Sequence, residues 1–114
     1  MKSLLILTGH TKGLGKAILD KFLSVENFRI VAVSRSTLDI QFEQLTQVAL
    51  DLSDLDKLEA ILQEIFPQGE FDRVILINNA GWIGEVKPVG KLHPKEIRKA
   101  MNLNFLAPMI LTDA

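Results

Sequence analysis

The fold is decided by the stretch Leu4-Leu5-Ile6-Leu7-Thr8-Gly9-His10-Thr11-Lys12-Gly13-Leu14-Gly15. Its four leading apolar residues are typical of a strand that is covered on both faces, as in a parallel sheet. The three glycines remove Cβ atoms where the backbone must pass close to another group. The apolar spacing that begins at Leu14 predicts a helix whose free N–H groups face the glycine turn and favour an anion. We therefore expect a strand, a tight turn and a helix that together bind an anion, with pyrophosphate as the foremost candidate.

The remaining pattern alternates strands with helices. Strands are predicted over 3–8, 29–34, 47–51 and 72–78, and helices over 14–25, 55–66 and from 94 toward 114. Residues 36–44 are expected to form a loop or a frayed helical turn, and 79–92 a long loop. Ser53 is expected to cap the second helix. Such alternation predicts a doubly wound α/β fold of the Rossmann type, with a parallel sheet in the strand order 3-2-1-4. Ligands of such sheets bind at the carboxyl ends of strands one and four, where the strand order reverses.

Composition restricts the class of protein. A length of 114 residues fits one domain, and a formal net charge of −1 gives no reason to expect a nucleic-acid partner. The chain has no cysteine, which excludes disulfides and thiolate metal sites and agrees with a cytoplasmic location. No apolar run approaches the roughly 20 residues of a membrane span, and the run after Met1 is too short for a signal peptide. His10 and His93 have no further ligand at metal spacing, so we expect no metal.

The end of the second predicted strand, Val33-Ser34-Arg35-Ser36, indicates which dinucleotide is bound. An acidic residue here would select NAD, whereas an arginine accommodates the 2′-phosphate of NADP. Lys12 supplies a second cation near the same phosphate. The alternative is that Arg35 and Lys12 are solvated surface charges. The absence of Gly-Lys-Ser or Gly-Lys-Thr excludes a P-loop. We expect NADP(H) as the cofactor.

Four motifs in order resemble the short-chain dehydrogenase/reductases over the whole chain. They are Thr-Gly-x-x-x-Gly-x-Gly at 8–15, Asp51-Leu52, Asn78-Asn79-Ala80-Gly81, and an asparagine, Asn104, in the last helix. The expected cofactor-binding residues are Gly9, Thr11, Lys12, Gly13, Leu14, Gly15, Ser34, Arg35, Asp51, Leu52, Asn79, Ala80 and Gly81. The resemblance implies that Asp51 and Leu52 touch the adenine, that residues 79–81 line the ribose side, and that Asn78 ties the central strands together. The alternative for Asp51 is an ordinary acid near a helix start.

Asn104 is the candidate catalytic residue. Pro108 has no N–H, so the Asn104 carbonyl four residues earlier lacks its helical partner and is free to bind water. The resemblance implies that this carbonyl holds a water of a proton relay. A helix kink without chemistry is the alternative.

The 114 residues lack the rest of the family's catalytic set. The family uses a Tyr-x-x-x-Lys pair and a serine, but the chain has no tyrosine and no serine after Ser53. We therefore expect the N-terminal, cofactor-binding half of a carbonyl reductase, inactive alone. The alternative is a complete, non-catalytic module that binds a nucleotide or a partner.

Two further expectations concern the substrate and the assembly. The run from Asn78 to Val86 is similar to the matching loop of sepiapterin reductase and benzil-reductase-like members. Trp82 in this loop either stacks on a small carbonyl substrate or on the nicotinamide, or is a packing residue. The last helix is apolar nearly all round, and the resemblance implies a homo-oligomer formed through it.

Overall fold

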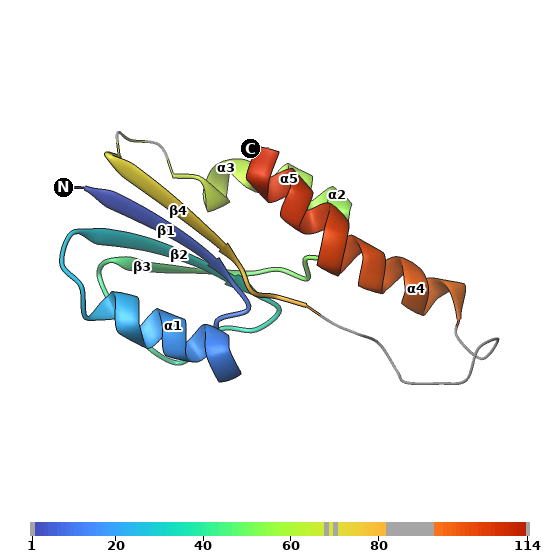
Figure 1. Cartoon of the computed structure of the whole chain (residues 1–114), viewed down its shortest axis with the longest axis horizontal. Helices are drawn as coiled ribbons and strands as arrows, with labels where there is room; N and C mark the ends of the chain where they lie inside the picture. Colours follow the sequence, from blue (N-terminus) through green and yellow to red (C-terminus); the bar gives the residue numbers. More distant parts are fainter. Residues whose placement is uncertain (1, 68, 70, 82–92, 114) are drawn as a thin grey trace.

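A four-stranded parallel sheet forms the centre of the fold (Figure 1). The computed structural model describes residues 2–67, 69, 71–81 and 93–113. The strands are β1 (Ser3–Thr8), β2 (Phe28–Ser34), β3 (Leu45–Ala49) and β4 (Arg73–Asn78), in the spatial order β3-β2-β1-β4. The predicted strand order is therefore confirmed. The predicted third strand is shifted, because pairing with β2 begins at Leu45 and ends at Ala49.

Strand β1 lies between β2 and β4, and all six of its residues are buried. Its register places Thr8 beside Val33 of β2 and Asn78 of β4. The turns that follow β1 and β4 therefore leave the sheet at the same level. Doubly wound folds bind their ligands at this end of the sheet, beyond the carboxyl ends of the strands.

The alternation of side chains along β1 gives the sheet two apolar faces. Leu5 and Leu7 pack with Leu19 of α1 (Gly13–Leu23), whereas Leu4 and Ile6 belong to the core of the opposite face. That face is covered by α2 (Leu55–Ala60), α3 (Leu62–Ile65) and α5 (Ala107–Asp113). Helix α1 and the group of α2, α3 and α5 thus form the outer layers of a three-layer arrangement (Figure 1).

The predicted helix over 55–66 is wrong in two details. It is divided at Ile61, whose φ of −115° and ψ of 14° are not helical. Its N-cap is Asp54, whose side chain accepts a hydrogen bond from the N–H of Lys57, and not Ser53. Ser53 instead donates its hydroxyl to Asp51, because an aspartate two residues earlier offers a nearer acceptor.

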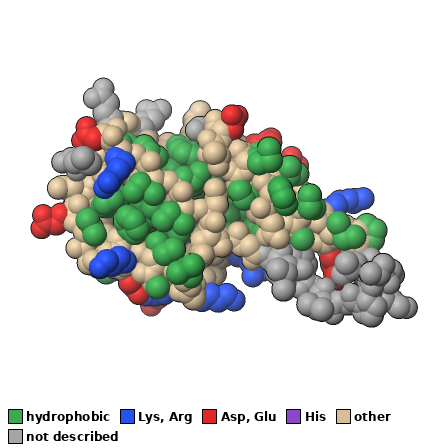
Figure 2. Space-filling view, in the orientation of Figure 1, with side chains coloured by type: hydrophobic (Ala, Val, Ile, Leu, Met, Phe, Trp, Pro, Cys, Tyr) green, Lys and Arg blue, Asp and Glu red, His purple; other side chains and the backbone are tan. Residues whose placement is uncertain are grey.

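The last helical segment comprises α4 (Pro94–Met101), a π-helical stretch η1 (Asn102–Leu106) and α5. Its α4 end extends past the carboxyl ends of the strands (Figure 1). Large apolar side chains are exposed along this segment, and Figure 2 shows them as a row separate from those over the sheet. Among the described residues, none of the helices has both the length and the apolar character needed to span a membrane.

Candidate cofactor-binding site

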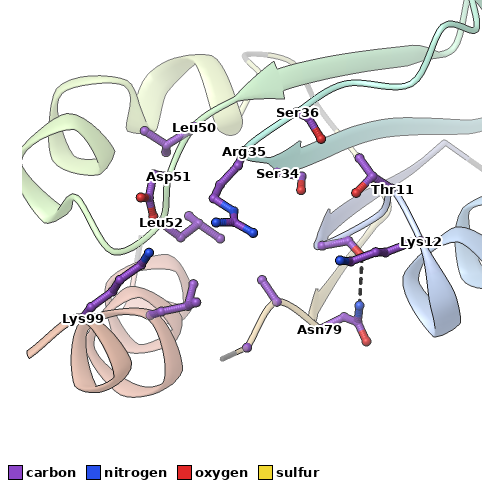
Figure 3. A pocket seen from close by; sticks show the side chains of 14 residues that line it. Thr11, Lys12, Ser34, Arg35, Ser36, Leu50, Asp51, Leu52, Asn79 and Lys99 are labelled. Carbon is purple, nitrogen blue, oxygen red and sulfur yellow. Dashed lines mark hydrogen bonds between the residues drawn. The ribbon is translucent and has the colours of Figure 1, made fainter. Parts of the chain in front are cut away.

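A cavity of about 340 Å³ lies at the carboxyl ends of the strands (Figure 3). It is lined by residues from the glycine turn, the ends of β2 and β3, the turn after β4, and the last helical segment. They are Gly9, Thr11, Lys12, Ser34, Arg35, Ser36, Leu50, Asp51, Leu52, Asn79, Ala80, Gly81, Lys99 and Leu103. The structure thus brings together ten of the thirteen expected cofactor-binding residues; Gly13, Leu14 and Gly15 are outside the lining.

The turns after β1 and β4 are joined by Thr8 and Asn79. The Thr8 hydroxyl oxygen accepts hydrogen bonds from the backbone N–H groups of Asn79 and Ala80, each at 3.0 Å. The Asn79 side chain donates to the carbonyl oxygen of Gly9 at 3.0 Å, which is the dashed line in Figure 3. Asn79 therefore connects the two turns, whereas Asn78 is exposed at the end of the edge strand β4.

The glycine turn is closely packed at two positions. Gly9 has a φ of +73°, and a Cβ there would lie 3.0 Å from the Cα of Ala80. A Cβ on Gly15 would overlap with the carbonyl oxygen of Gly9. Gly15 is therefore outside the lining but sets the shape of the turn, because only glycine lets helix α1 start so close to β1.

Helix α1 begins without the usual means of satisfying its first N–H groups. Lys12 is the N-cap residue, its side chain makes no capping hydrogen bond, and the first turn contains no acidic residue. Leu14 in this first turn is 70% exposed. The unpaired N–H groups and the helix dipole leave this end of the helix suited to an anionic group.

Three cationic side chains reach the cavity from three different elements. Arg35 follows β2, Lys12 belongs to the glycine turn, and Lys99 comes from α4; Figure 3 shows the Arg35 guanidinium directed into the cavity. The hydroxyl residues Ser34 and Ser36 flank Arg35 in the lining. A planar guanidinium with hydroxyl neighbours and a second cation is a suitable arrangement for a phosphate group.

Asp51 is the acidic residue of the lining. Burial raises the pKa of its carboxyl, but the hydrogen bonds from the Ser53 hydroxyl (2.6 Å) and N–H (3.0 Å) and the charges of Lys99 and Arg35 outweigh this, so that its pKa is below the ordinary value. Asp51 therefore stays ionised and is an acceptor held in a fixed orientation. Asp51 is not the N-cap of α2, since Asp54 caps this helix, but it lies in the turn directly before it.

Four lining residues were missed from the sequence: Ser36, Leu50, Lys99 and Leu103. Ser36 and Leu50 are immediate neighbours of the expected Arg35 and Asp51. Lys99 and Leu103 continue, at four-residue spacing, the stripe formed by the buried Ala107 and Leu111. A charged residue in register with a buried helix stripe is the signal that would have indicated Lys99.

Asn104 lies beside the turn after β4 without lining the cavity. Its side-chain oxygen is 3.3 Å from the position of a Cβ built on Gly81. It belongs to the π-helical stretch that directly precedes Ala107 and Pro108, where the Ala107 N–H bonds the carbonyl of Asn102. The segment directly before Pro108 is thus π-helical and not regular α-helix. Trp82 lies outside the described residues.

The last helical segment is also fixed to the Asp51 side of the cavity. The Asn102 side chain donates a hydrogen bond to the carbonyl oxygen of Ser53 at 3.1 Å. Within the described ranges, no group of three or more His, Asp or Glu side chains is placed to hold a metal ion.

The site and the fold together match an oxidoreductase family. A family model described as short chain dehydrogenase matches residues 3–114, and the chain belongs to this family. Curated relatives include the benzil reductases ((S)-benzoin forming) of Bacillus subtilis (strain 168) and Bacillus cereus, which are 34% and 35% identical over 96% and 94% of this chain. The chain spans 46% and 47% of the length of these two relatives.

Solved structures of the same family superpose well on the chain. A short-chain dehydrogenase/reductase from Burkholderia vietnamiensis is 30% identical, with a TM-score of 0.87 over 98% of this chain and 55% of its own. A metagenomic short-chain oxidoreductase in complex with NADP is 26% identical, with a TM-score of 0.77 over 98% of this chain and 54% of its own. An oxidoreductase from Brucella ovis, 24% identical and with a TM-score of 0.73 over 99% of this chain and 56% of its own, contains a partially ordered NAD.

Proposed function

We propose that residues 1–114 are the cofactor-binding part of an NADPH-dependent carbonyl reductase. The observation that carries the proposal is that Arg35 and Lys12 line one cavity. Arg35 follows the end of β2, where an NAD-selective site would have an acidic residue. Relatives of this family bind either NADP or NAD, so the preference for NADPH rests on these two cations.

The described residues fit a dinucleotide in their chemistry. The uncapped start of α1 and the glycine turn suit a pyrophosphate, because free N–H groups and absent Cβ atoms face it. The apolar side chains of Leu50, Leu52 and Leu103 suit a flat base, and Asp51 offers an ionised acceptor beside them. Asn79, Ala80 and Gly81 would then be on the ribose side.

Catalysis needs more than these residues supply. The bound cofactor would provide a hydride to the carbonyl carbon of the substrate. We propose that the Asn104 carbonyl, beside the turn after β4, holds a water through which a proton reaches the catalytic acid. The 114 residues contain no tyrosine to act as that acid, so this part of the protein should bind NADPH without turning over a ketone.

The substrate class is proposed from the relatives. Two benzil reductases are about a third identical over nearly the whole chain, so an aromatic diketone is the first substrate to test on the full-length protein. The second candidate function, a non-catalytic module that binds a nucleotide or a partner, is favoured by the absence of tyrosine. Reduction of benzil by the full-length protein would exclude it.

The test of the cofactor assignment is a comparison of NADPH and NADH binding by titration calorimetry. Replacing Arg35 with alanine should weaken NADPH binding by about 10- to 100-fold, the range expected when charge-assisted hydrogen bonds are lost, and should leave NADH binding nearly unchanged. Arg29→Ala is the matched control, because Arg29 is an exposed arginine at the other end of the same strand. Equal wild-type affinities for NADPH and NADH would contradict the assignment.

A further inference from the structure

A fully buried histidine lies inside the glycine turn. His10 is 0% exposed, although it stands between Gly9 and Thr11, which both line the cavity. Its Nε2 atom is 2.8 Å from the side-chain oxygen Oε1 of Gln47 in β3. Its Nδ1 atom is buried and has no hydrogen-bond partner among the described residues. An apolar side chain would fill this space without leaving an unpaired polar atom.

The contacts of Gln47 determine which ring nitrogen of His10 is a hydrogen-bond donor. Gln47 Oε1 accepts the backbone N–H of Leu38 at 2.8 Å, and Gln47 Nε2 donates to the carbonyl oxygens of Leu38 (2.9 Å) and Ile40 (3.5 Å). The backbone groups therefore orient the amide, and only its oxygen faces His10. Because that oxygen accepts hydrogen bonds, His10 Nε2 must carry the proton. With the His10 contact, all four hydrogen-bonding positions of the amide are used.

This network joins the two cationic sides of the cavity. On one side, His10 is followed directly by Thr11 and Lys12 in the lining. On the other side, Leu38 follows Arg35 and Ser36 by only three and two residues, in a connection without helix or strand. Gln47 is thus the bridge between the turn that carries Lys12 and the segment that carries Arg35. Neither His10 nor Gln47 lines the cavity.

We propose that His10 and Gln47 are positioning residues for selection of the 2′-phosphate. By holding the two segments together, they fix the separation of Lys12 and Arg35, and the site has its phosphate-binding geometry before the cofactor arrives. This role rests on the proposed NADPH-binding function. Loss of this positioning weakens NADPH binding more than NADH binding, because only NADPH has the 2′-phosphate that both cations must reach at once.

The test is the ratio of NADH to NADPH dissociation constants for variants of the full chain. His10→Phe keeps a ring of similar size and removes the donor, and it should lower the ratio by about three- to tenfold, the range for one net hydrogen bond. His10→Gln, whose amide N–H can replace Nε2–H, should restore most of the ratio. Gln47→Leu should act like His10→Phe. Thermal melting with detection by circular dichroism establishes that each variant is folded.

Two results would overturn the positioning role. One is a His10→Phe variant that melts earlier but keeps the wild-type ratio, as expected of a merely structural residue. The other is an undiminished effect of His10→Phe in an Arg35→Ala background, where a residue acting through Arg35 should have lost most of its influence on the ratio. Failure of the proposed function itself is distinguishable, because wild-type protein would then show no NADPH preference.

Discussion

At the scale of single residues, Gly15 and Gly13 are glycines for two different reasons: Gly15 has no room for a Cβ, and Gly13 has a positive φ. A Cβ on Gly15 would overlap with the Gly9 carbonyl and lie 2.6 Å from the Asn79 side-chain nitrogen, whereas one on Gly13 would meet open space. Gly15→Ala should therefore lower the free energy of unfolding by about 3 kcal/mol or more. Gly13→Ala should lower it by only about 1–2 kcal/mol, since the strain of its φ of +60° is the only penalty.

Urea denaturation of the full chain measures both changes. The two variants form a matched pair, because each adds one methyl group to the same turn. Equal losses for Gly13→Ala and Gly15→Ala would contradict the close approach of α1 to β1.

Asp51 should make stability depend on pH. Because its pKa is lower in the folded chain than in the unfolded chain, the ionised carboxylate contributes stability at neutral pH, and this contribution is lost as the pH falls below about 4. The difference in unfolding free energy between wild type and Asp51→Asn should thus be largest near pH 7, about 1 kcal/mol, and shrink toward pH 3. Denaturant titrations across this range measure it, with exposed Glu59→Gln as control. A constant difference would contradict the role of Ser53 as donor to the ionised form.

Residues with distinctive backbone or charge requirements were the predictable part of the site. The glycines, Arg35 and Asp51 follow from where the strands end. Lys99 was missed because its neighbours in the cavity come from other elements. The last helical segment packs on the core through Leu103, Ala107 and Leu111, and this packing brings Lys99 into the lining with Asp51. The Thr8 hydroxyl was missed because a threonine at a strand end has many uses, and its two N–H donors are more than 70 positions away.

At the scale of elements, Pro108 and the π-helical stretch η1 belong together. An alanine at position 108 would supply the backbone N–H that proline lacks. This N–H would compete for the Asn104 carbonyl, and η1 should shorten toward a regular α-helix. If that carbonyl holds a catalytic water, Pro108→Ala should lower kcat of the full-length protein by about tenfold or more, a loss at the lower end of general acid–base effects, with little change in the NADPH dissociation constant. Steady-state kinetics and calorimetry separate the two. An unchanged kcat would leave Pro108 with a structural role only.

Strands were easier to predict than helices in this chain. Ser3–Thr8 and the fourth strand are short, continuous apolar runs, and no competing pattern exists for them. The helix predicted over 55–66 has an unbroken apolar stripe, yet it divides at Ile61. Leu58 of α2 and Ile65 of α3 are buried in the same core cluster, so the division leaves the apolar stripe on the sheet, and the apolar pattern gives no sign of it.

At the scale of the whole molecule, the topology was predictable because alternating elements leave few arrangements. How completely the two faces and the edges of the sheet are covered was not predictable. Among the described helices, α1 packs on the face that contains Leu5 and Leu7, and β4 is an edge strand whose Val74 is 55% exposed. Unpaired strand edges and open apolar faces favour association with further chain.

The last helical segment shows which face should take part in self-association. Four apolar side chains recur at every fourth residue of this segment and are about half exposed or more: Ile97 (49%), Met101 (49%), Phe105 (59%) and Met109 (63%). Ala107 and Leu111 of the same segment are instead buried. An apolar stripe of this length on a helix is a typical interface, and we expect the full chain to form a homo-oligomer through it. Phe105→Glu should therefore reduce the mass measured by sedimentation velocity to that of a monomer, because a carboxylate cannot be buried there unpaired. Phe42→Glu, at a comparably exposed loop phenylalanine, should leave the mass unchanged. An oligomer that survives Phe105→Glu would place the interface elsewhere, with the β4 edge as the next surface to test.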